Sequence, residues 1–472
     1  MPTLVADLVA ALGADAVRAQ AVDRVLFAKD AGVTRGEVHA VVLPADTSGV
    51  VAAVRIARSH GVPVVARGAG TGLAGGAVPA DPAVVIVTMR MNSIEVDAAN
   101  RTAWVGPGVI NLDLSRHTAP LGLYFAPDPS SQAACTIGGN IANNSGGPHC
   151  LAEGTTSNHV LAVEFVDFAG EVHTAGGPAP DPTGLDVRGV LVGSEGTLGI
   201  ITRALVRLTP NPPAVRTMLF AYSEVSGAAA TVSGIIAAGM VPAALEMMDR
   251  PLIRAVENFV HAGLPVDAAA VLLAEVTGHP AGIAAEADAI VAIAANNGAF
   301  QTRVAADEAE RELLWKARKS AFGAIAQIAP DYYLHDVVVP RTRLVEALQR
   351  IYEIAKRFDL MVLNTIHAGD GNLHPKFLYD ASVPDQGRRV KEAAGEIVRM
   401  AIDLGGALSG EHGIGLEKRD LMPLTFSPVD LDAQARLREA FDPDKVFNPG
   451  SMLPRGSRCM DYGRPIPEGA WV

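Results

Sequence analysis

Three glycine-rich segments, all in the first half of the chain, restrict the fold of this protein more than any other feature. The first is RGAGTGLAGG at 67–76, the second is the long segment 127–147, and the third is VGSEGTLGI at 192–200. Neighbouring glycines let the backbone approach a ligand closely, so that successive N–H groups can form an anion-binding nest. Three such loops would cover an extended polar cofactor better than an isolated phosphate group. The sequence therefore predicts a cofactor-binding domain in its first half.

The first segment contains the spacing of a dinucleotide-binding fingerprint, GxGxxG from Gly70 to Gly75, with Glu95 about twenty residues later. A Rossmann fold needs a helix directly after the last glycine, because the helix N-terminus holds the pyrophosphate. Pro79 and Pro82 follow instead, and no helix is expected to begin there. The residues thus favour a different phosphate-binding loop. A tight turn without a ligand stays the alternative for this loop taken alone.

The amino-acid composition excludes several classes of protein. With 472 residues, of which 49% are hydrophobic, the chain can bury a large core in more than one domain. A net charge of −12 argues against nucleic-acid binding, and no apolar run is long enough to span a membrane. The N-terminus lacks the basic region of a secretory signal. Cys135, Cys150 and Cys459 are too few and too scattered for a disulfide framework or an iron–sulfur site. We expect a cytoplasmic enzyme with reduced thiols.

The remaining pattern separates the chain into two parts. In the first half, strands and helices surround the glycine loops, and hairpins are expected to turn near 99–100 and 169–170. The PNPP sequence at 210–213 is a strong breaker and marks a candidate domain boundary. Beyond it, strands alternate with helices. This alternation fits an α+β domain with its helices on one face of an antiparallel sheet.

The segment HAGDGNLHPKF at 367–377 holds two histidines, at a spacing that would place them on opposite faces of a straight strand. Asp370-Gly371 is a favoured two-residue turn, and a hairpin with that turn would place His367 directly opposite His374. Directly opposed side chains share a face, with Cβ atoms about 4.5–5.5 Å apart. The hairpin would let both imidazoles bind one metal ion. An exposed pair without a metal stays the alternative.

A third ligand is available in SGEHGIG at 409–415, where Glu411 stands beside His412. A carboxylate with two imidazoles is a familiar zinc-binding set that leaves a fourth position open. His412 would then be available as a base. An ordinary polar loop is the alternative for this segment taken alone.

LWKARKSAFG at 314–323 places Arg318 between Lys316 and Lys319. An arginine can bind a carboxylate with two parallel hydrogen bonds, so Arg318 is a candidate for holding an anionic substrate. A solvated basic helix face is the alternative.

The ordered set of glycine segments resembles the FAD-binding domain of the vanillyl-alcohol oxidase and p-cresol methylhydroxylase superfamily. KVFNPGSMLP near the C-terminus fits as well, and the resemblance covers nearly the whole chain. The chain is most similar to the FAD-linked D-2-hydroxyacid dehydrogenase and glycolate oxidase family. This resemblance implies an α+β fold. A PCMH-type FAD-binding domain with two subdomains (1–212) would be followed by an α+β substrate or cap domain (213–425). A C-terminal helical segment (426–472) would return to the FAD-binding domain.

The resemblance also implies which residues bind the cofactor. The expected FAD contacts are Arg67, Gly68, Ala69, Gly70, Thr71, Gly72, Leu73, Asp128, Pro129, Gly138, Gly139, Asn143, Ser145, Glu195, Ile200 and Asn448. Some relatives bind flavin covalently through a histidine in the first loop. This loop has none, so we expect non-covalent FAD. Cys135 is either a flavin neighbour or a small buried residue.

For the second half, the resemblance implies that His367, His374 and Glu411 bind a divalent metal, most simply zinc, and that His412 is the catalytic base. Arg318 would bind the substrate carboxylate. The hydroxyglutarate enzymes of the family also have a lysine where Leu334 and His335 stand here. This difference favours a small monocarboxylate such as D-lactate or glycolate. The expected substrate-binding residues are Arg318, Lys376 and His412. Because Lys376 could supply a second cation, D-2-hydroxyglutarate stays the alternative substrate.

The predicted reaction is oxidation of a D-2-hydroxy acid to the 2-oxo acid, with hydride transfer to flavin N5. The electrons would then pass to an external acceptor: a quinone, an electron-transfer flavoprotein or a partner subunit. We expect no nucleic-acid partner and no transmembrane segment. A homodimer or a hetero-complex, peripheral to the membrane through its partner, is left open. A function of another class, a metal-dependent hydrolase with a nucleotide substrate on the glycine loops, is the competing hypothesis.

Overall fold

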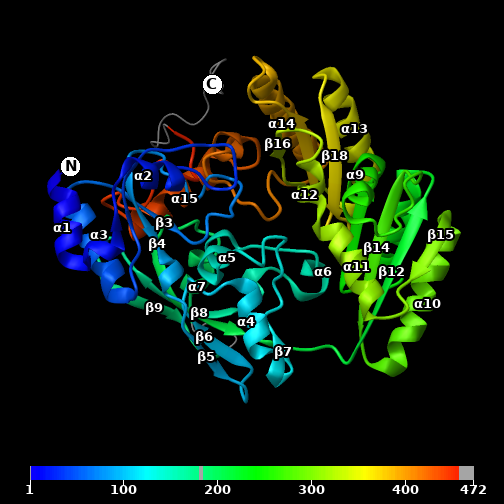
Figure 1. Cartoon of the computed structure of the whole chain (residues 1–472), viewed down its shortest axis with the longest axis horizontal. Helices are drawn as coiled ribbons and strands as arrows, with labels where there is room; N and C mark the ends of the chain where they lie inside the picture. The colour runs from blue at the N-terminus through cyan, green and yellow to red at the C-terminus, as the bar shows by residue number, and fades with distance from the viewer. Residues whose placement is uncertain (1, 180–183, 456–472) are drawn as a thin grey trace. The chain divides into compact units, whose positions relative to one another are not determined.

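The computed structural model describes residues 2–179 and 184–455 (Figure 1). Cys459 and the end of the predicted 426–472 segment lie outside the described residues. Helices and strands mix throughout both halves, as the α+β prediction requires, and the predicted C-terminal helix is α15 (Pro428–Phe441).

The chain divides into two compact units. The N-terminal unit consists of the residues up to 146, residues 154–211 and the described residues from 411 onward. The central unit consists of residues 147–153 and 212–410. The change of unit after residue 211 lies beside the predicted boundary. The chain returns at Glu411, earlier than the predicted residue 426, and the sequence does not predict the short segment 147–153 of the central unit.

The N-terminal unit has two main sheets among its described residues (Figure 1). The first follows the order β1-β2-β4-β3 and is parallel except for β1. The second follows the order β5-β6-β10-β8-β9 and is antiparallel, and a small pair joins β11 to β7. The two predicted hairpins are confirmed as β5–β6 and β8–β9. The strands are β1 (Val17–Arg18), β2 (Val38–Val42), β3 (Val64–Arg67), β4 (Ala83–Val87), β5 (Ile94–Asp97), β6 (Thr102–Val105), β7 (Leu123–Tyr124), β8 (Val160–Val166), β9 (Val172–Gly176), β10 (Ile200–Arg207) and β11 (Thr209–Pro210).

Helices cover these sheets through apolar stripes. Helix α3 (Thr47–Ser59) buries Val50, Val54 and Ala57 at helical spacing against the first sheet, and Asp46 caps its N-terminus by accepting a hydrogen bond from Gly49 N. Phe447, from the last part of the chain, is fully buried in the same core. Besides α3 and α15, the described α-helices of this unit are α1 (Pro2–Leu12), α2 (Ala21–Phe27), α4 (Asn111–Thr118), α5 (Ile137–Asn143) and α7 (Val187–Leu191).

The central unit is built on one antiparallel sheet with strand order β15-β12-β14-β13-β18-β19-β16, to which β17 is added beside β19. Its strands are β12 (Ala214–Tyr222), β13 (Ala244–Asp249), β14 (Ala270–Gly278), β15 (Ala299–Val304), β16 (Asp331–Leu334), β17 (Val337–Val338), β18 (Met361–His367) and β19 (Asn372–Tyr379). Its helices are α6 (Cys150–Glu153), α8 (Val225–Ala237), α9 (Arg250–Val260), α10 (Pro280–Asn296), α11 (Glu308–Lys319), α12 (Ala321–Ile325), α13 (Leu344–Arg357) and α14 (Gln386–Asp403).

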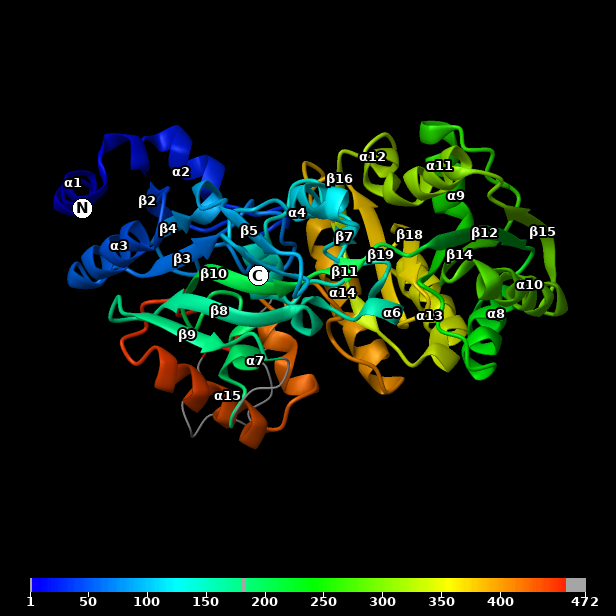
Figure 2. The ribbon, with the colours of Figure 1, turned by 90° about the horizontal axis from the view of Figure 1, so that it is seen from below.

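The prediction that helices cover one face of this sheet is wrong, because both faces are covered (Figure 2). Leu219 and Ala221 of β12 pack in one core with residues of α9, α11 and α12. Tyr222 faces the other way and donates a hydrogen bond to Thr231 of α8 at 2.8 Å. The continuous burial of β12 from Thr217 to Tyr222 gives the physical reason, since a strand covered on both faces needs no polar alternation.

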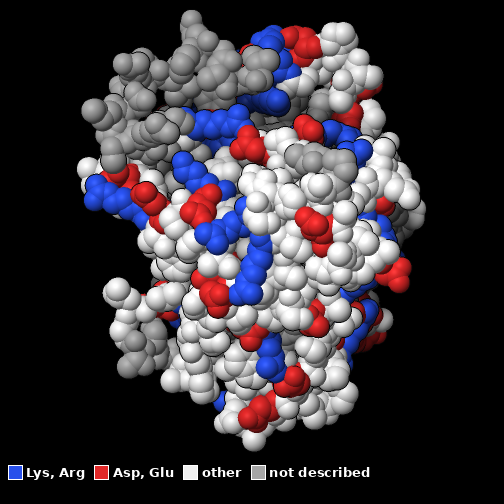
Figure 3. Space-filling view, turned by 90° about the vertical axis from the view of Figure 1, so that its left-hand side faces the viewer, with Lys and Arg blue, Asp and Glu red and all other residues white. Residues whose placement is uncertain are grey.

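Two surface properties bear on the predicted partners. Within the described part of the chain, no helix is long and apolar enough to cross a membrane. On the face of the molecule in Figure 3, lysines and arginines are interspersed with acidic side chains instead of forming a patch of one sign.

Candidate active site

The three predicted cofactor segments lie together in the N-terminal unit. A Cβ atom on Gly68 of the first segment would meet Thr136 Oγ1 of the second at 2.2 Å. Gly193 N of the third segment donates to Ile141 O of the second at 2.9 Å, and Glu195 N donates to Ala142 O at 2.8 Å. The structure thus brings together loops that are far apart in the sequence.

The first loop runs from β3 to β4 without any helix, which excludes the Rossmann arrangement. Gly70 has φ +72° and lies against the guanidinium of Arg67, so a larger residue would be both strained and obstructed. Arg67 is buried and donates from Nη1 to Lys29 O at 2.8 Å. On Gly72, in contrast, a Cβ would meet nothing closer than 3.7 Å. The loop is fixed on one side and leaves space at Gly72, as a cradle for a phosphate-bearing cofactor requires.

Asp30 supports this loop, and sequence reasoning missed it. Its carboxylate accepts hydrogen bonds from Gly32 N at 2.8 Å and from Gly75 N at 2.9 Å. Burial raises the pKa of Asp30, while these two bonds and the charge of Arg67 act in the opposite direction. Asp30 lies far upstream of the loop and outside any motif, so no local sequence signal could have found it.

The second segment is anchored at the N-terminus of α5. Thr136 caps this helix by accepting from Gly139 N at 3.2 Å. A Cβ on Gly138 would lie 2.5 Å from Pro107, which explains the small residue there. Ser145 uses its backbone inside the segment, because Ser145 N donates to Asn140 O and Ser145 O accepts from Thr156.

Cys135 is a buried residue of this segment. Asn140 Nδ2 donates to its sulfur at 3.3 Å, and burial raises the pKa of the thiol. A buried thiol with a raised pKa is poorly nucleophilic, so its environment fits a structural role. Asp128 and Pro129 are half-buried in the loop before it. That loop is held by Asn111, which donates to Pro127 O at 2.9 Å.

Two more predicted cofactor contacts, Ile200 of the third segment and Asn448 of the C-terminal motif, have different surroundings. Ile200 is buried as the first residue of β10. Asn448 uses both ends of its amide, because Nδ2 donates to Val78 O and Oδ1 accepts from Ala80 N, each at 3.0 Å. The amide predicted to contact the cofactor therefore holds the chain that follows the first loop.

The two histidines of the central unit converge, but not through the predicted register. His367 pairs with Asn372, and Thr365 pairs with His374, so residues 368–371 form the connection and Asp370-Gly371 is not a two-residue turn. Ala368 N donates to Leu245 O on the neighbouring strand at 2.8 Å, which draws the chain into this longer connection. The shift is two residues, so His367 and His374 still share a face. Their ring centroids are 5.0 Å apart.

A buried glutamate, which the sequence analysis missed, joins His367 to Arg318. Glu246 of β13 pairs with His367 across the sheet, and its Oε1 lies 2.6 Å from His367 Nδ1. Its Oε2 lies 2.5 Å from Arg318 Nη2. All three side chains belong to residues that are at most 4% exposed. The signal was present, because Glu246 interrupts the otherwise apolar strand ALEMMD before its final aspartate.

Asp336 is a buried carboxylate beside His374. Its Oδ1 lies 3.9 Å from His374 Nδ1, and its Oδ2 accepts from Ser409 Oγ at 2.7 Å and from Gly410 N at 2.9 Å. Asp336 therefore fixes the last two residues of the central unit, directly before Glu411 in the chain.

Lys376 is buried, and its ammonium group bonds within the unit. Nζ donates to Thr365 Oγ1 at 2.5 Å and to His374 O at 3.0 Å. Burial and the neighbouring Arg318 lower the pKa of Lys376 well below its ordinary value. Leu334 pairs with Lys376 across the sheet, and His335 is 1% exposed.

Glu411 and His412 belong to the N-terminal unit. His412 O accepts a hydrogen bond from Asn143 Nδ2 of the second glycine segment at 3.1 Å. His412 Nε2 lies 4.0 Å from Glu411 Oε1, and both side chains are partly buried. The predicted base is thus attached to the predicted cofactor loops through its own backbone.

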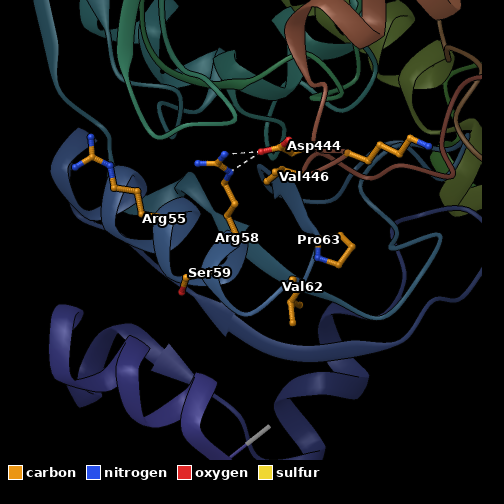
Figure 4. A pocket seen from close by; sticks show the side chains of 9 residues that line it. Arg55, Arg58, Ser59, Val62, Pro63, Asp444 and Val446 are labelled. Carbon is orange, nitrogen blue, oxygen red and sulfur yellow. Dashed lines mark hydrogen bonds and ion pairs between the residues drawn. The ribbon is translucent and has the colours of Figure 1, made fainter.

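A separate cavity of about 510 Å³ lies in the same unit (Figure 4). Arg58 Nε donates to Asp444 Oδ2 at 2.8 Å, so the charge of that arginine is offset. The labelled lining residues are Arg55, Arg58, Ser59, Val62, Pro63, Asp444 and Val446. They include no predicted site residue, so this cavity is distinct from the candidate active site.

Two family profiles match the chain: the FAD binding domain at residues 38–176 and the C-terminal domain of FAD linked oxidases at residues 211–452. Glycolate oxidase subunit GlcD of Escherichia coli (strain K12) is 44% identical over 424 residues, which cover 90% of this chain and 85% of that protein. The protein of the same name from Bacillus subtilis is 41% identical over 421 residues, 89% of this chain and 90% of that protein. D-lactate dehydrogenase of Archaeoglobus fulgidus is 32% identical and covers 88% of this chain and 91% of that protein.

Solved structures agree on the fold. The 4-ethylphenol oxidase from Gulosibacter chungangensis aligns with a TM-score of 0.81 at 19% identity, covering 97% of this chain and 98% of that one. The p-cresol methylhydroxylase aligns with a TM-score of 0.81 at 16% identity, covering 96% of each chain. At these identities the similarity establishes the fold alone. Together with the family profiles, it shows that this chain belongs to the FAD-linked oxidases, as an FAD-dependent oxidoreductase with a PCMH-type FAD-binding fold.

Proposed function

We propose that this protein oxidises a small 2-hydroxy acid to the corresponding 2-oxo acid, with glycolate or D-lactate as the favoured substrate. The buried cluster of Arg318, Glu246 and His367 carries this proposal. Two of the relatives above are named glycolate oxidase subunits and a third is named a D-lactate dehydrogenase, which supports the same substrate class. The N-terminal unit would bind FAD, and the central unit would bind the acid.

Arg318 would hold the substrate carboxylate. Its guanidinium uses Nη2 for Glu246, while its Nε is buried and has no hydrogen-bond partner among the described residues. A buried donor without a partner costs free energy, about 1–3 kcal/mol, unless a ligand satisfies it. A carboxylate could accept from the Nε edge of the planar guanidinium through two parallel bonds.

The charges around Arg318 favour a monocarboxylate over a dicarboxylate. Glu246 offsets part of the charge of Arg318, and Lys376 already donates to Thr365 and His374. Leu334 and His335, which stand where the hydroxyglutarate enzymes are expected to have a lysine, are buried. D-2-hydroxyglutarate, whose second carboxylate would need that cation, is therefore the weaker candidate.

The donor atoms also suit a divalent cation such as zinc, with His367, His374 and Glu411 as its ligands. Glu246 Oε1 can only accept, so Nδ1 of His367 carries the proton and Nε2 keeps its lone pair for a metal. Glu411 directly follows Gly410, which Asp336 holds in the central unit. A cation at these ligands would supply Lewis-acid activation of the substrate hydroxyl, and FAD would supply the hydride acceptor.

His412 would take the proton of the substrate hydroxyl as the general base. Imidazole exchanges protons near neutral pH, which suits this role. Its backbone is held by Asn143, so the imidazole would keep a defined position beside the cofactor loops. The cofactor contacts proposed from the sequence stay as stated there, with two exceptions: the amide of Asn448 makes its bonds within the chain, and the carboxyl group of Glu195 accepts from Ile414 N.

The electrons would leave through an external acceptor. The relatives from Escherichia coli and Bacillus subtilis are named as subunits, which supports a partner subunit over free diffusion to a quinone or to an electron-transfer flavoprotein.

A screen of flavin reduction tests the proposal. The purified protein should be yellow, and anaerobic addition of glycolate or D-lactate should bleach the flavin absorbance, while L-lactate and D-2-hydroxyglutarate should act at least tenfold more slowly. The family assignment contradicts the hydrolase hypothesis. A colourless protein that cannot take up FAD would overturn the proposed reaction, because it would hold no hydride acceptor. A yellow protein that no 2-hydroxy acid can bleach would overturn the proposed reaction while leaving the flavoprotein assignment intact.

A further inference from the structure

We propose that Glu195 is a positioning residue for His412: its carboxyl group fixes the loop that carries the base against the cofactor segments. This inference rests on the proposed function, since it assigns a purpose to the loop after His412. It also changes the expected role of Glu195 from a cofactor contact to a clamp.

The backbone of Glu195 is held in an unusual conformation. Its φ is +51°, in the left-handed region that few residues other than glycine adopt. It lies between Gly193 at φ +82° and Gly196 at φ +69°, and its N–H donates to Ala142 O at 2.8 Å. A strained backbone at a buried residue persists only where the surrounding structure requires it. Here it directs the carboxyl group inward instead of to solvent.

The carboxyl group binds the loop that follows His412. Glu195 Oε1 accepts from Ile414 N at 2.7 Å. A Cβ on Gly413, which has φ +87°, would lie 2.5 Å from Oε1. The glycines of EHGIG thus allow the backbone to close on the carboxyl group.

The same carboxyl group reaches the first cofactor loop. A Cβ on Gly76 would lie 2.8 Å from Glu195 Oε2. Beyond the glycines, Leu416 N and Glu417 N both donate to Ala74 O, at 2.9 and 3.1 Å. With Asn143 bound to His412 O, the base loop is attached to all three cofactor segments. Glu195 is the side chain at the centre of these attachments.

Such a clamp matters because the reaction rate falls steeply when the catalytic base is displaced. A misplacement of about 1 Å at a reacting group can cost about 100-fold in rate. The carboxyl group acts as a hydrogen-bond acceptor for the backbone. Glutamine keeps one acceptor oxygen and should preserve the position of the loop, whereas alanine has no acceptor and should not. This difference distinguishes positioning from a requirement for charge.

The test measures single-turnover flavin reduction by glycolate or D-lactate, whichever the wild type oxidises faster. Glu195→Ala should retain FAD and should be reduced by dithionite as the wild type is. Its limiting rate of reduction by the acid should fall at least tenfold, while its apparent Kd for the acid should change less. Glu195→Gln should stay within about threefold of the wild type. Glu164→Ala is the matched control, because Glu164 also accepts side-chain hydrogen bonds in this unit, from Thr47 and Thr202, without touching the base loop.

The possible outcomes can be told apart. If Glu195→Ala holds FAD and is reduced by the acid at the wild-type rate, the inference is wrong. If the wild type itself is not reduced, the proposed function fails instead. If Glu195→Ala does not fold, Gly413→Ala takes its place, because it keeps the carboxyl group but obstructs the contact. A wild-type rate in Gly413→Ala would also overturn the inference.

Discussion

Two buried glutamates, one in each unit, have opposite surroundings. Glu275 of β14 is surrounded by side-chain donors: Arg311 Nε and Nη2 at 3.0 Å each, Trp315 Nε1 at 2.6 Å and Thr217 Oγ1 at 2.5 Å. Burial raises the pKa of Glu275, but bonds from His149, Arg311 and Thr217 outweigh it and hold the pKa well below its ordinary value. In Glu195, where the donors are backbone N–H groups, burial prevails and raises the pKa to about 7.

This difference separates the two units generally. The central unit builds its site from charged side chains that neutralise one another, as Arg318 and Glu246 do. The N-terminal unit builds its site from backbone loops, where glycine supplies conformation and side chains supply few charges. We therefore expect the central unit to be sensitive to the loss of a side chain and the N-terminal unit to be sensitive to the addition of one.

The largest effect is expected from Arg318→Ala. It removes the proposed anchor of the substrate carboxylate and leaves Glu246 buried without its cation. Loss of one partner from a buried charged pair costs about 2–5 kcal/mol, so kcat/KM should fall by about 30- to 5,000-fold. Steady-state kinetics with an artificial acceptor measure this loss. Lys316→Ala, which removes a cation from the same helix, serves as the control and should change kcat/KM by less than about twofold.

The next largest effect is expected on stability, from Glu246→Ala. The variant leaves Arg318 as an unpaired buried charge, and breaking a buried pair in this way costs about 3–5 kcal/mol. Urea denaturation followed by the fluorescence of Trp315, which lies in this unit, reports the loss. Glu246→Gln should lose less, because its amide oxygen still accepts from Arg318. Equal stability of the alanine variant and the wild type would contradict the view that this unit depends on compensated charges.

A smaller effect concerns pH and Glu195. Because its folded pKa of about 7 is above its ordinary value of 4.5, the folded state binds more protons between these values, and the stabilisation present below pH 4.5 is lost as the pH rises through 7. A shift of this size corresponds to about 3 kcal/mol. This carboxyl group interacts electrostatically with three charged groups: Asp30, Lys418 and Arg438.

Glu195→Gln carries no titrating group at this position. The stability of the wild type relative to this variant should therefore decline by up to about 3 kcal/mol between pH 5 and pH 8, measured by denaturation at each pH. A difference that is constant across that range would mean that Glu195 does not titrate there.

The smallest effects should come from added methyl groups in the first loop. In Gly68→Ala the Cβ would lie 2.2 Å from Thr136 Oγ1, so we expect the apoprotein to lose about 1–3 kcal/mol of stability. In Gly72→Ala nothing lies within 3.7 Å, so apoprotein stability should change little while FAD affinity decreases. Titration of the apoprotein with FAD measures this. Gly177→Ala, which has open space around it, is the neutral control. Unchanged FAD affinity in Gly72→Ala would place the cofactor elsewhere.

The hairpin of His367 and His374 shows which structural features of the site can be predicted from the sequence. Alternation along a strand and a turn-forming Asp-Gly pair were sufficient to predict convergence of the imidazoles. The register was wrong by two residues, because it depends on Leu245 O, a backbone acceptor from a strand that is distant in sequence. The prediction that the two imidazoles converge is still correct, because a register shift of two residues keeps each side chain on the same face of the sheet.

Other parts of the site depend on tertiary contacts that no local pattern encodes. Asp30 acts on a loop far from it in sequence and stands in no motif. Glu246 does interrupt an apolar strand, but its partners His367 and Arg318 are distant in sequence. Asn448 does stand in a motif, but its side-chain amide forms hydrogen bonds with the backbone of Val78 and Ala80. Motifs thus predicted which loops matter, whereas the buried carboxylates that hold those loops became apparent only in the folded chain.

The division of the N-terminal unit into separate stretches of chain has a consequence for biosynthesis. Val446 O accepts from Val64 N at 2.7 Å, and Phe447 completes the core around α3, yet these residues are translated hundreds of positions apart. Domains tend to fold as they emerge from the ribosome. Here the central unit can finish folding while the N-terminal unit still lacks part of its core. A stalled chain in which residues 1–410 have left the ribosomal exit tunnel should therefore have a protease-resistant central unit, while the first 146 residues remain cleavable.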